Sequence, residues 1–469
     1  KMALSAKWIF SAILGIIAVI LGNLYIFTLD KNTRAKLLRG QFVIVIQTLM
    51  FVGSKYIYKH LFIKIVKNQK PGSDHQGKKD HERAMNEQQY KPSKGIRIWR
   101  FIVLTFLILS HLSYFTNLFL IGTEPHWFAM LCYTCLGTFI QLLWCLFLLG
   151  IIQKIAIFLN RYNSVILKPK VRASIAIVMA LCLASIGIYT VSGMPKVKKV
   201  TIPLKNWPQS LEGFRIVQLT DIHLGPTVGK TMLEGLILRV NELDPDLVVL
   251  TGDLTDATVE RLNGAADPLQ HLHGRYGRFF VTGNHEYYTG DVDHWFRHLK
   301  SLDFTVLHND CVEIRSKNNP KEHFCLAGTD DREAVRFQYG DHRMDLPKAV
   351  KDCEERSPII LLAHQPKSAK EALQSNPNIS LVLSGHTHGG QMFPISIGAW
   401  LVNPYYQGLY QYSPHQYVYV SPGTFYFGIP MRIFTSMELT EITIMSETKW
   451  KQSLEKKRPK PITAKPAKN

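Results

Sequence analysis

Residues 214–225 read Phe-Arg-Ile-Val-Gln-Leu-Thr-Asp-Ile-His-Leu-Gly, a short apolar run that ends in an Asp-x-His sequence. Four further stretches also place polar residues after an apolar run. They are Leu247–Leu250 before Gly252-Asp253, Phe279–Val281 before Gly283-Asn284-His285, Ile359–Leu362 before His364, and Ile379–Leu383 before Gly385-His386-Thr387-His388. Continuous apolar runs of about four to eight residues are typical of buried strands. We therefore predict an α/β domain whose polar residues lie at the carboxyl ends of strands, where open α/β sheets place their sites.

The polar residues of these five blocks have the chemistry of metal ligands. Asp221 and His223 are two positions apart, so an extended chain directs both side chains to one face, and His386 and His388 repeat this spacing. Carboxylate and imidazole together suit zinc, iron or manganese ions, and the two oxygens of Asp253 can bridge a pair of ions. The candidate ligands are Asp221, His223, Asp253, Asn284, His364, His386 and His388. With two divalent ions this cluster keeps a charge of about +2, which attracts phosphate and acidifies bound water.

The five blocks resemble, in order and spacing, the calcineurin-like metallophosphoesterase superfamily over roughly 200–445. The longer segments 218–225 and 385–394 are similar to its bacterial membrane-associated branch. This resemblance implies a four-layer αββα sandwich, with two mixed sheets between outer helices. It also implies a hydrolase that acts on phosphoric ester bonds.

The resemblance implies a role for each residue as well. One metal would be held by Asp221, His223, Asp253 and His388, and the second by Asp253, Asn284, His364 and His386. Asp253 and a hydroxide would bridge the two divalent ions, whose identity as Mn, Zn or Fe stays open. His285 would be the catalytic residue, because it would protonate the leaving oxygen or stabilise its charge. The alternative role for His285 is to position Asn284.

Other residues near the blocks receive no ligand role. Asp330 and Asp331 are expected to shape the site and Glu286 to support it. Tyr287 and Tyr288 either line the substrate cleft or pack in the core, and Arg432 either contacts a phosphate or pairs structurally. The aromatic stretch 400–427 is expected mainly in the sheet core, with part of it forming an apolar wall for a lipid-like substrate. The histidines outside the blocks are expected to be structural: His271, His273, His294, His298, His308, His323 and His342.

The N-terminal half contains long apolar runs instead of short ones. They lie at 8–29, 41–58, 101–122, 127–152 and 173–193. A membrane-spanning helix needs about 20 mostly apolar residues, so we predict an α-helical multi-pass membrane region of about five helices over 1–195. The first run is too long for a cleavable signal peptide, and a second run follows it closely. The metallophosphoesterase domain then covers 196–450, and the Lys- and Pro-rich stretch 451–469 is expected to be a disordered basic tail.

The loops between these runs predict the orientation of the chain. The stretch 55–100, which contains the basic loop 59–98, has twelve Lys and Arg against four acidic residues, and 153–172 has five Lys and Arg. Because cytoplasmic loops are enriched in Lys and Arg, both loops are expected in the cytoplasm, and the C-terminal domain outside it or in a lumen. If 41–58 does not span, this placement stays and only the N-terminus changes side. The glycosylation sequon Asn378-Ile379-Ser380 gives weak support.

The net charge of +19 is consistent with an anionic membrane surface. Nucleic acid is not an expected partner, because no nucleic-acid-binding motif accompanies the charge. Seven cysteines do not indicate a disulfide framework, although one bridge with one free thiol in the C-terminal half stays open. Cys132 and Cys135 have the spacing of a redox or zinc pair, but they lie in an apolar run and are expected to pack there.

The sequence therefore predicts a membrane-anchored, metal-dependent phosphoesterase that hydrolyses phosphomonoesters or phosphodiesters. The membrane region suggests a lipid-linked or other membrane-proximal phosphate ester as the substrate. A phosphoprotein phosphatase and a membrane receptor or scaffold that binds phosphoryl groups without turnover are the alternatives. Transport through the apolar runs is less favoured, because they carry few ionisable residues, of which His111 is one.

Overall fold

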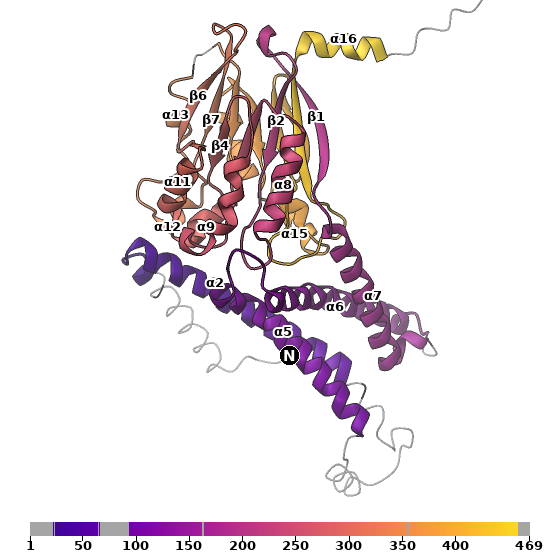
Figure 1. Cartoon of the computed structure of the whole chain (residues 1–469). Helices are drawn as coiled ribbons and strands as arrows, with labels where there is room; N and C mark the ends of the chain where they lie inside the picture. The colour runs from indigo at the N-terminus through magenta and orange to yellow at the C-terminus, as the bar shows by residue number, and fades with distance from the viewer. Residues whose placement is uncertain are drawn as a thin grey trace, which may run out of the picture.

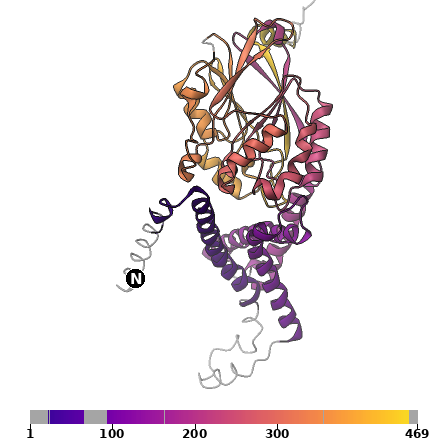
Figure 2. The same cartoon turned by 60° about the vertical axis from the view of Figure 1, so that its left-hand side comes forward.

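The computed structural model describes residues 22, 24–63, 65, 93–161, 164–353 and 356–457. Long helices from the N-terminal half gather on one side of an α/β domain formed by the C-terminal half (Figures 1 and 2). The predicted fold class, an α/β sandwich preceded by apolar helices, is confirmed.

The N-terminal part is helical. Its elements are α2 (Lys31–Tyr58), the π-helix η1 (Lys59–Ile63), α5 (Lys94–Phe119), α6 (Trp127–Phe158), the 3₁₀ helix η2 (Val165–Leu167) and α7 (Pro169–Val191). Among the described residues, four helical segments are long and apolar enough to cross a membrane: Thr33–Ile63, Lys94–Phe119, Trp127–Phe158 and Pro169–Val191. The predicted run 41–58 lies inside α2, and α5, α6 and α7 overlap the next three. The run 8–29 and the loop 59–98 lie largely outside the described residues.

Two six-stranded sheets form the centre of the C-terminal domain. The order in the first is β1-β12-β2-β3-β4-β5, and in the second β10-β11-β9-β8-β7-β6. The strands of the first sheet are β1 (Lys196–Leu204), β2 (Phe214–Leu219), β3 (Leu247–Thr251), β4 (Arg278–Val281), β5 (Thr305–Val306) and β12 (Glu438–Ser446). Those of the second are β6 (Asp310–Arg315), β7 (His323–Gly328), β8 (Ile359–Leu362), β9 (Ile379–Ser384), β10 (Gly408–Ser413) and β11 (Gln416–Val420). Both sheets are mixed, because β12 runs antiparallel to β2, and β6 to β7.

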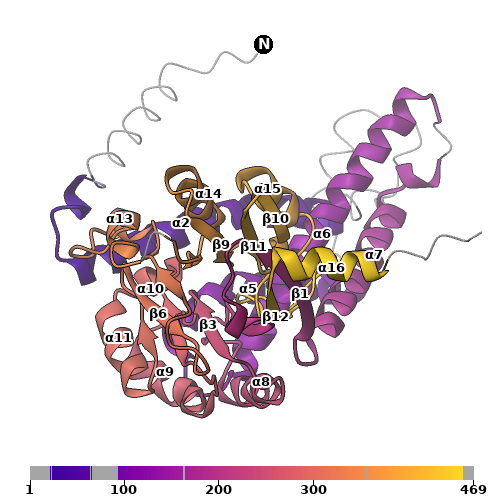
Figure 3. The same cartoon turned by 90° about the horizontal axis from the view of Figure 1, so that it is seen from above.

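The two sheets pack face to face and helices cover their outer faces. Ile216 and Val249 of the first sheet share one buried core with Leu326 and Ile360 of the second. The helices α8 (Lys230–Glu242), α9 (Val259–Ala266) and α11 (Val292–Ser301) lie on one side, and α14 (Pro366–Ser375) on the other (Figure 3). Shorter elements are η3 (Gln209–Leu211), η4 (Asp267–His271), α10 (Asn284–Thr289), α12 (Ala334–Phe337), α13 (Leu346–Ala349), η5 (His388–Gly390) and α15 (Ile395–Val402). This is the four-layer αββα arrangement.

The domain contacts the long helices through the loops at one edge of the sheets. The backbone N–H of Arg432 donates to the carbonyl of Gly187 in α7 at 3.1 Å, and Nε2 of Gln141 in α6 donates to the carbonyl of Phe393 at 2.7 Å. The N–H of Lys230 donates to the carbonyl of Thr123 at 2.9 Å. Strands β2, β3, β4, β8 and β9 end at this edge, so the predicted ligands lie on the side of the domain that faces the helices.

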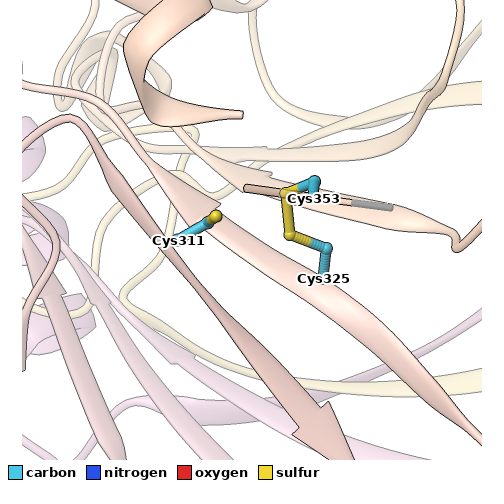
Figure 4. A group of neighbouring side chains, drawn as sticks. All are labelled: Cys311, Cys325 and Cys353. Atoms are coloured by element: carbon cyan, nitrogen blue, oxygen red, sulfur yellow. A yellow bond between two sulfur atoms is a disulfide. The ribbon is translucent and has the colours of Figure 1, made fainter. Parts of the chain in front are cut away.

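Two further features bear on the predictions. Cys325 in β7 forms a disulfide with Cys353, and the free Cys311 of β6 lies beside this bridge (Figure 4). The pattern is therefore one bridge with one free thiol. Helix α16 (Glu447–Lys457) includes the first part of the stretch that the sequence predicts as a disordered tail, and the remainder, 458–469, lies outside the described residues.

Candidate active site

The predicted ligands stand on sharply turned backbone just beyond the strand ends. Asp221, His223, Asp253, His386 and His388 all have positive φ angles, between 51° and 71°. Non-glycine residues rarely adopt this conformation, and it concentrates at functional sites. The expectation that an extended chain aims Asp221 and His223 to one face is therefore wrong. Strand β2 ends at Leu219, and both residues lie beyond it in the left-handed region.

Two glycines allow the turns to approach one another. Gly252 has a φ of +89°, and a Cβ there would lie 2.5 Å from the backbone nitrogen of Gly283. A Cβ on Gly283 would in turn collide with the carboxylate of Asp253. Side chains at these positions would push the β3 and β4 turns apart, so glycine is needed for their close contact.

The structure brings all seven candidate ligands together. Donor atoms of Asp221, His223 and His388 lie within 4.8 Å of one another, and so do those of Asp253, His364 and His386. The Oδ2 atom of Asp253 lies 3.1 Å from His364 Nε2 and 3.8 Å from His223 Nε2, between the two groups. Asn284 joins them, with its Oδ1 2.8 Å from His386 Nδ1.

The donor set fits divalent metal ions, as His364 shows most directly. Its Nδ1 lies 2.7 Å from the carbonyl of Thr251, which can only accept, so Nδ1 carries the proton. Its Nε2 is buried, has no hydrogen-bond partner and lies 3.1 Å from Asp253. A buried lone pair beside a carboxylate oxygen is a ligand arrangement for a cation.

The electrostatics of the site also favour cations. Burial alone lowers the pKa of His364, but the charges of Asp253 and Asp221 raise it well above the usual range. Burial, followed by the charge on His364, lowers the pKa of His386 to about 3. Burial and the neighbouring His223 also lower the pKa of His388. Neutral imidazole is the form that binds metal, so His386 and His388 are held in that form, and the two carboxylates beside His364 attract a cation.

Asp256 supports the site although the sequence did not point to it. Its buried Oδ1 lies 3.0 Å from His223 Nδ1 and 2.7 Å from His285 Nδ1. The carboxylate therefore orients both rings and leaves Nε2 of each directed elsewhere. Its position three residues after Asp253 is the only sequence signal that we can identify for this role.

Glu286 supports the backbone of the site, in agreement with its expected role. Its carboxylate accepts hydrogen bonds from the N–H groups of Gly283, Asp253 and Leu254 at 2.6, 3.0 and 2.8 Å. Burial, helped by the charge of Asp253, raises the pKa of Glu286 to about 6. The contacts tie the β3 turn to the start of α10.

His285 lies at the opening of the site. Its side chain is 16% exposed and is flanked by the rings of Phe427 and Tyr288, whose centroids lie 4.7 and 4.9 Å away. Burial opposes the charged form, but Asp253 and Asp256 raise the pKa of His285 to about 9. The two carboxylates therefore favour the cationic form of the imidazole.

The structure settles two alternatives that the sequence leaves open. Arg432 is fully buried and donates to the carbonyls of His388 and Pro422 at 2.8 and 2.7 Å, so it pairs structurally. Tyr287 is buried in the core, whereas Tyr288 is partly exposed beside His285.

Comparisons with known proteins agree with this geometry. The family model described as calcineurin-like phosphoesterase matches residues 214–390. A protein of Danio rerio named "Transmembrane protein with metallophosphoesterase domain" is 45% identical over 419 residues, covering 88% of this chain and 91% of its own. A Bos taurus protein of the same name is 38% identical, covering 95% and 98%. An uncharacterized metallophosphoesterase of Helicobacter pylori is 37% identical over 55% of this chain and 66% of its own.

The match to the Danio rerio relative extends over nearly the whole of both chains, including regions outside the phosphoesterase match. Metal binding is a property of this family. The chain therefore belongs to the calcineurin-like metallophosphoesterases, and over its length it is similar to the transmembrane proteins that carry this domain.

Proposed function

We propose that this chain hydrolyses phosphomonoesters or phosphodiesters at a site that holds two divalent metal ions. The partnerless, buried Nε2 of His364 facing Asp253 is the observation that carries this proposal. Asp221, His223, Asp253 and His388 would hold one ion, and Asp253, Asn284, His364 and His386 the other. When bound, two such ions acidify water and neutralise the charge of a phosphoryl group.

His285 would act as the general acid in this reaction. Asp256 holds its Nδ1, so Nε2 is the nitrogen available to a substrate at the opening. A cationic imidazole in this place can donate a proton to the leaving oxygen or stabilise its negative charge. Phe427 and Tyr288 restrict the rotation of the ring from two sides.

The surface beside the site supports a lipid-linked substrate. Helix α15 has the sequence Ile-Ser-Ile-Gly-Ala-Trp-Leu-Val, and none of its residues is buried. Trp400, Leu401 and Val402 are 61%, 68% and 62% exposed. Such a contiguous apolar surface is typical of contact with a partner or a membrane. Trp400, at the start of the aromatic stretch 400–427, thus lies on this apolar surface and outside the sheet core.

Helix α15 is also joined to both the site and the long helices. Its Ser396 packs against Gly390, two residues after His388. Just before the helix, the ring of Phe393 contacts Trp144 of α6, with centroids 5.3 Å apart. Because α6 is apolar enough to span a membrane, α15 would rest on the same bilayer. A phosphate ester carried on a lipid would then reach the site from the membrane surface.

Contacts of the domain support its placement opposite the Lys- and Arg-rich loops. Besides the contact of Lys230 with Thr123, the N–H of Thr231 donates to Oε1 of Glu124 at 2.9 Å. Residues 123–126 contain no Lys or Arg. The α6–α7 connection lies at the far end of these helices from the domain (Figure 1). By the positive-inside rule, the domain would be extracytoplasmic or lumenal.

The test is an assay of the full chain, purified in detergent and supplied with Mn²⁺. We expect turnover of p-nitrophenyl phosphate or bis-p-nitrophenyl phosphate by the wild-type chain. In Asp253→Ala the turnover rate should fall by about a hundredfold or more. Asp303→Ala is the matched control, because its side chain is 93% exposed. Turnover that survives in Asp253→Ala would refute the two-metal site. Binding of phosphate without turnover would favour a receptor, and preference for phosphopeptides would favour a phosphoprotein phosphatase.

A further inference from the structure

A second group of metal-ligand side chains lies outside the seven residues of the candidate active site. His308 follows β5, Asp330 follows β7, and His342 lies between α12 and α13. Donor atoms of the three lie within 4.8 Å of one another. Three separate segments within 308–342 thus place two imidazoles and one carboxylate together.

The individual distances suit a single ion. Both oxygens of Asp330 lie 2.8 Å from His308 Nδ1, and Oδ2 lies 3.6 Å from His342 Nδ1. Zinc-type ions bind nitrogen and oxygen at about 2.0–2.2 Å, so two ligands of one ion lie within about 4.4 Å of each other. We propose that His308, Asp330 and His342 form a further binding site for a divalent transition-metal ion, separate from the catalytic pair.

Surrounding contacts hold these ligands in place. Nδ2 of Asn309 donates to Oδ2 of Asp330 at 3.2 Å and to the carbonyl of Arg343 at 2.8 Å. Nε2 of His342 lies 3.5 Å from Asp293, on the side opposite Asp330. A carboxylate behind the ring favours the proton on Nε2, which is the usual outer arrangement of metal-bound histidine. The Nδ1 lone pair then faces Asp330 and the hydroxyl of Tyr287, so an ion at Nδ1 would replace the hydrogen bond of that hydroxyl.

An ion pair between His308 and the buried Asp330 accounts for one imidazole of this group. The second ring, His342, is tilted by 39° relative to the first, with centroids 4.3 Å apart, and its Nδ1 faces the same carboxylate. A divalent ion would take the place of the proton between His308 and Asp330 and would bind both rings. His308 is 29% exposed, so an ion can reach the group from solvent.

Such an ion would stabilise the segment that packs against α10, the first helix after the β4 turn of the active site. The hydroxyl of Tyr287 lies 3.1 Å from His342 Nδ1 and 3.3 Å from the hydroxyl of Thr282. Tyr287 belongs to α10, the helix that begins with Asn284 and His285. The ion would therefore fix the 338–345 segment against the helix that presents these two residues.

Metal content of the full chain tests the inference. Wild type, His308→Ala, His342→Ala and the control His294→Ala would be purified in detergent, stripped with chelator, reloaded with Zn²⁺ and measured by mass spectrometry. His294 is a suitable control because it also pairs with an aspartate but is 63% exposed. We expect each site variant to bind one ion fewer per chain than wild type, and His294→Ala to bind the same number.

The same measurement in an Asp253→Ala background separates this site from the catalytic one. If the site exists, that background retains one ion, and adding His342→Ala removes it. His308→Gln and His342→Gln serve if the alanine variants do not fold, as checked by circular dichroism. Equal zinc content in wild type and folded His308 and His342 variants would overturn the proposal, whatever becomes of the catalytic pair.

Discussion

The ligand residues depend on two carboxylates that are not ligands themselves. Asp256 accepts from the rings of His223 and His285, and Glu286 accepts from four backbone N–H groups around Asp253. Both acids are buried, so these contacts compensate the loss of water around their carboxylates. At the residue scale, the site is therefore a set of strained turns whose ligands are held in position by the side chains of Asp256 and Glu286.

Asp256→Ala should separate orientation from ligation. The change removes the acceptor that holds His223 and His285 but none of the seven ligands. Outer partners of this kind typically contribute about 10–100-fold to activity or metal affinity, so we expect a loss of kcat in that range. Turnover of p-nitrophenyl phosphate and metal content would be measured together. Asp256→Asn, which keeps one acceptor oxygen, should recover part of the activity; full activity in Asp256→Ala would contradict the role.

Elements that connect the site to its surroundings are short and irregular. Helix α15 leaves its apolar residues exposed, and the 427–433 segment carries Phe427 at the opening and Arg432 behind His388. The second sheet carries the Cys325–Cys353 disulfide, which joins β7 to the turn before β8. Each of these features can be altered by substitution at one or two positions.

If α15 rests on a bilayer, a probe attached to it should be shielded from water. Leu401→Cys, in a Cys182→Ser and Cys311→Ser background, would be labelled with a fluorophore and reconstituted in liposomes. Quenching by lipid-bound nitroxide should exceed quenching by aqueous iodide. Leu238→Cys on α8 is the matched control, because Leu238 is 67% exposed and Leu401 is 68% exposed. Iodide quenching as strong at position 401 as at 238 would exclude membrane contact.

The disulfide should stabilise the second sheet. It closes a loop with a sequence separation of 28 residues, and native bridges typically contribute about 2–4 kcal/mol. Thermal unfolding of the purified chain should therefore occur at lower temperature after reduction, and in a Cys325→Ser, Cys353→Ser double variant. Cys311→Ser leaves the bridge intact and should unfold like wild type. An unchanged unfolding temperature in the double variant would show that the bridge contributes nothing to stability.

At the scale of the whole molecule, the sequence predicts features that depend on neighbouring residues and misses those that depend on contacts between distant segments. The α/β domain and the clustering of the seven candidate ligands could be predicted from the blocks, because each block puts its polar residues next to its own strand, and the resemblance to the family implied the four-layer sandwich. The contacts of Asp256, the left-handed backbone of Asp221 and the exposure of α15 could not, since each depends on segments distant in sequence. The hydrogen bond between Arg432 and Gly187 joins a loop near the end of the C-terminal domain to α7, which precedes that domain in the sequence.

That hydrogen bond makes the 427–433 segment a link between the long helices and the site. At one end Arg432 is bonded to the α7 carbonyl of Gly187 and to the carbonyl of His388. At the other end the ring of Phe427 lies 4.8 Å from His223 and 4.7 Å from His285. Between them Gly428 accepts from the hydroxyl of Thr227 at 2.8 Å. A displacement at α7 should therefore reach the opening of the site.

Gly187→Leu tests this coupling. A Cβ at Gly187 would lie 3.0 Å from Cβ of Met431 and 3.1 Å from Cγ1 of Ile433, so a larger side chain must push the segment away from α7. We expect turnover of p-nitrophenyl phosphate to fall by about tenfold or more, as misplacement of site residues commonly causes, while the metal content stays at the wild-type value. Gly193→Leu is the control, because a Cβ there meets nothing within 4 Å. If Gly187→Leu folds and keeps full turnover, the helices anchor the domain without influencing its chemistry.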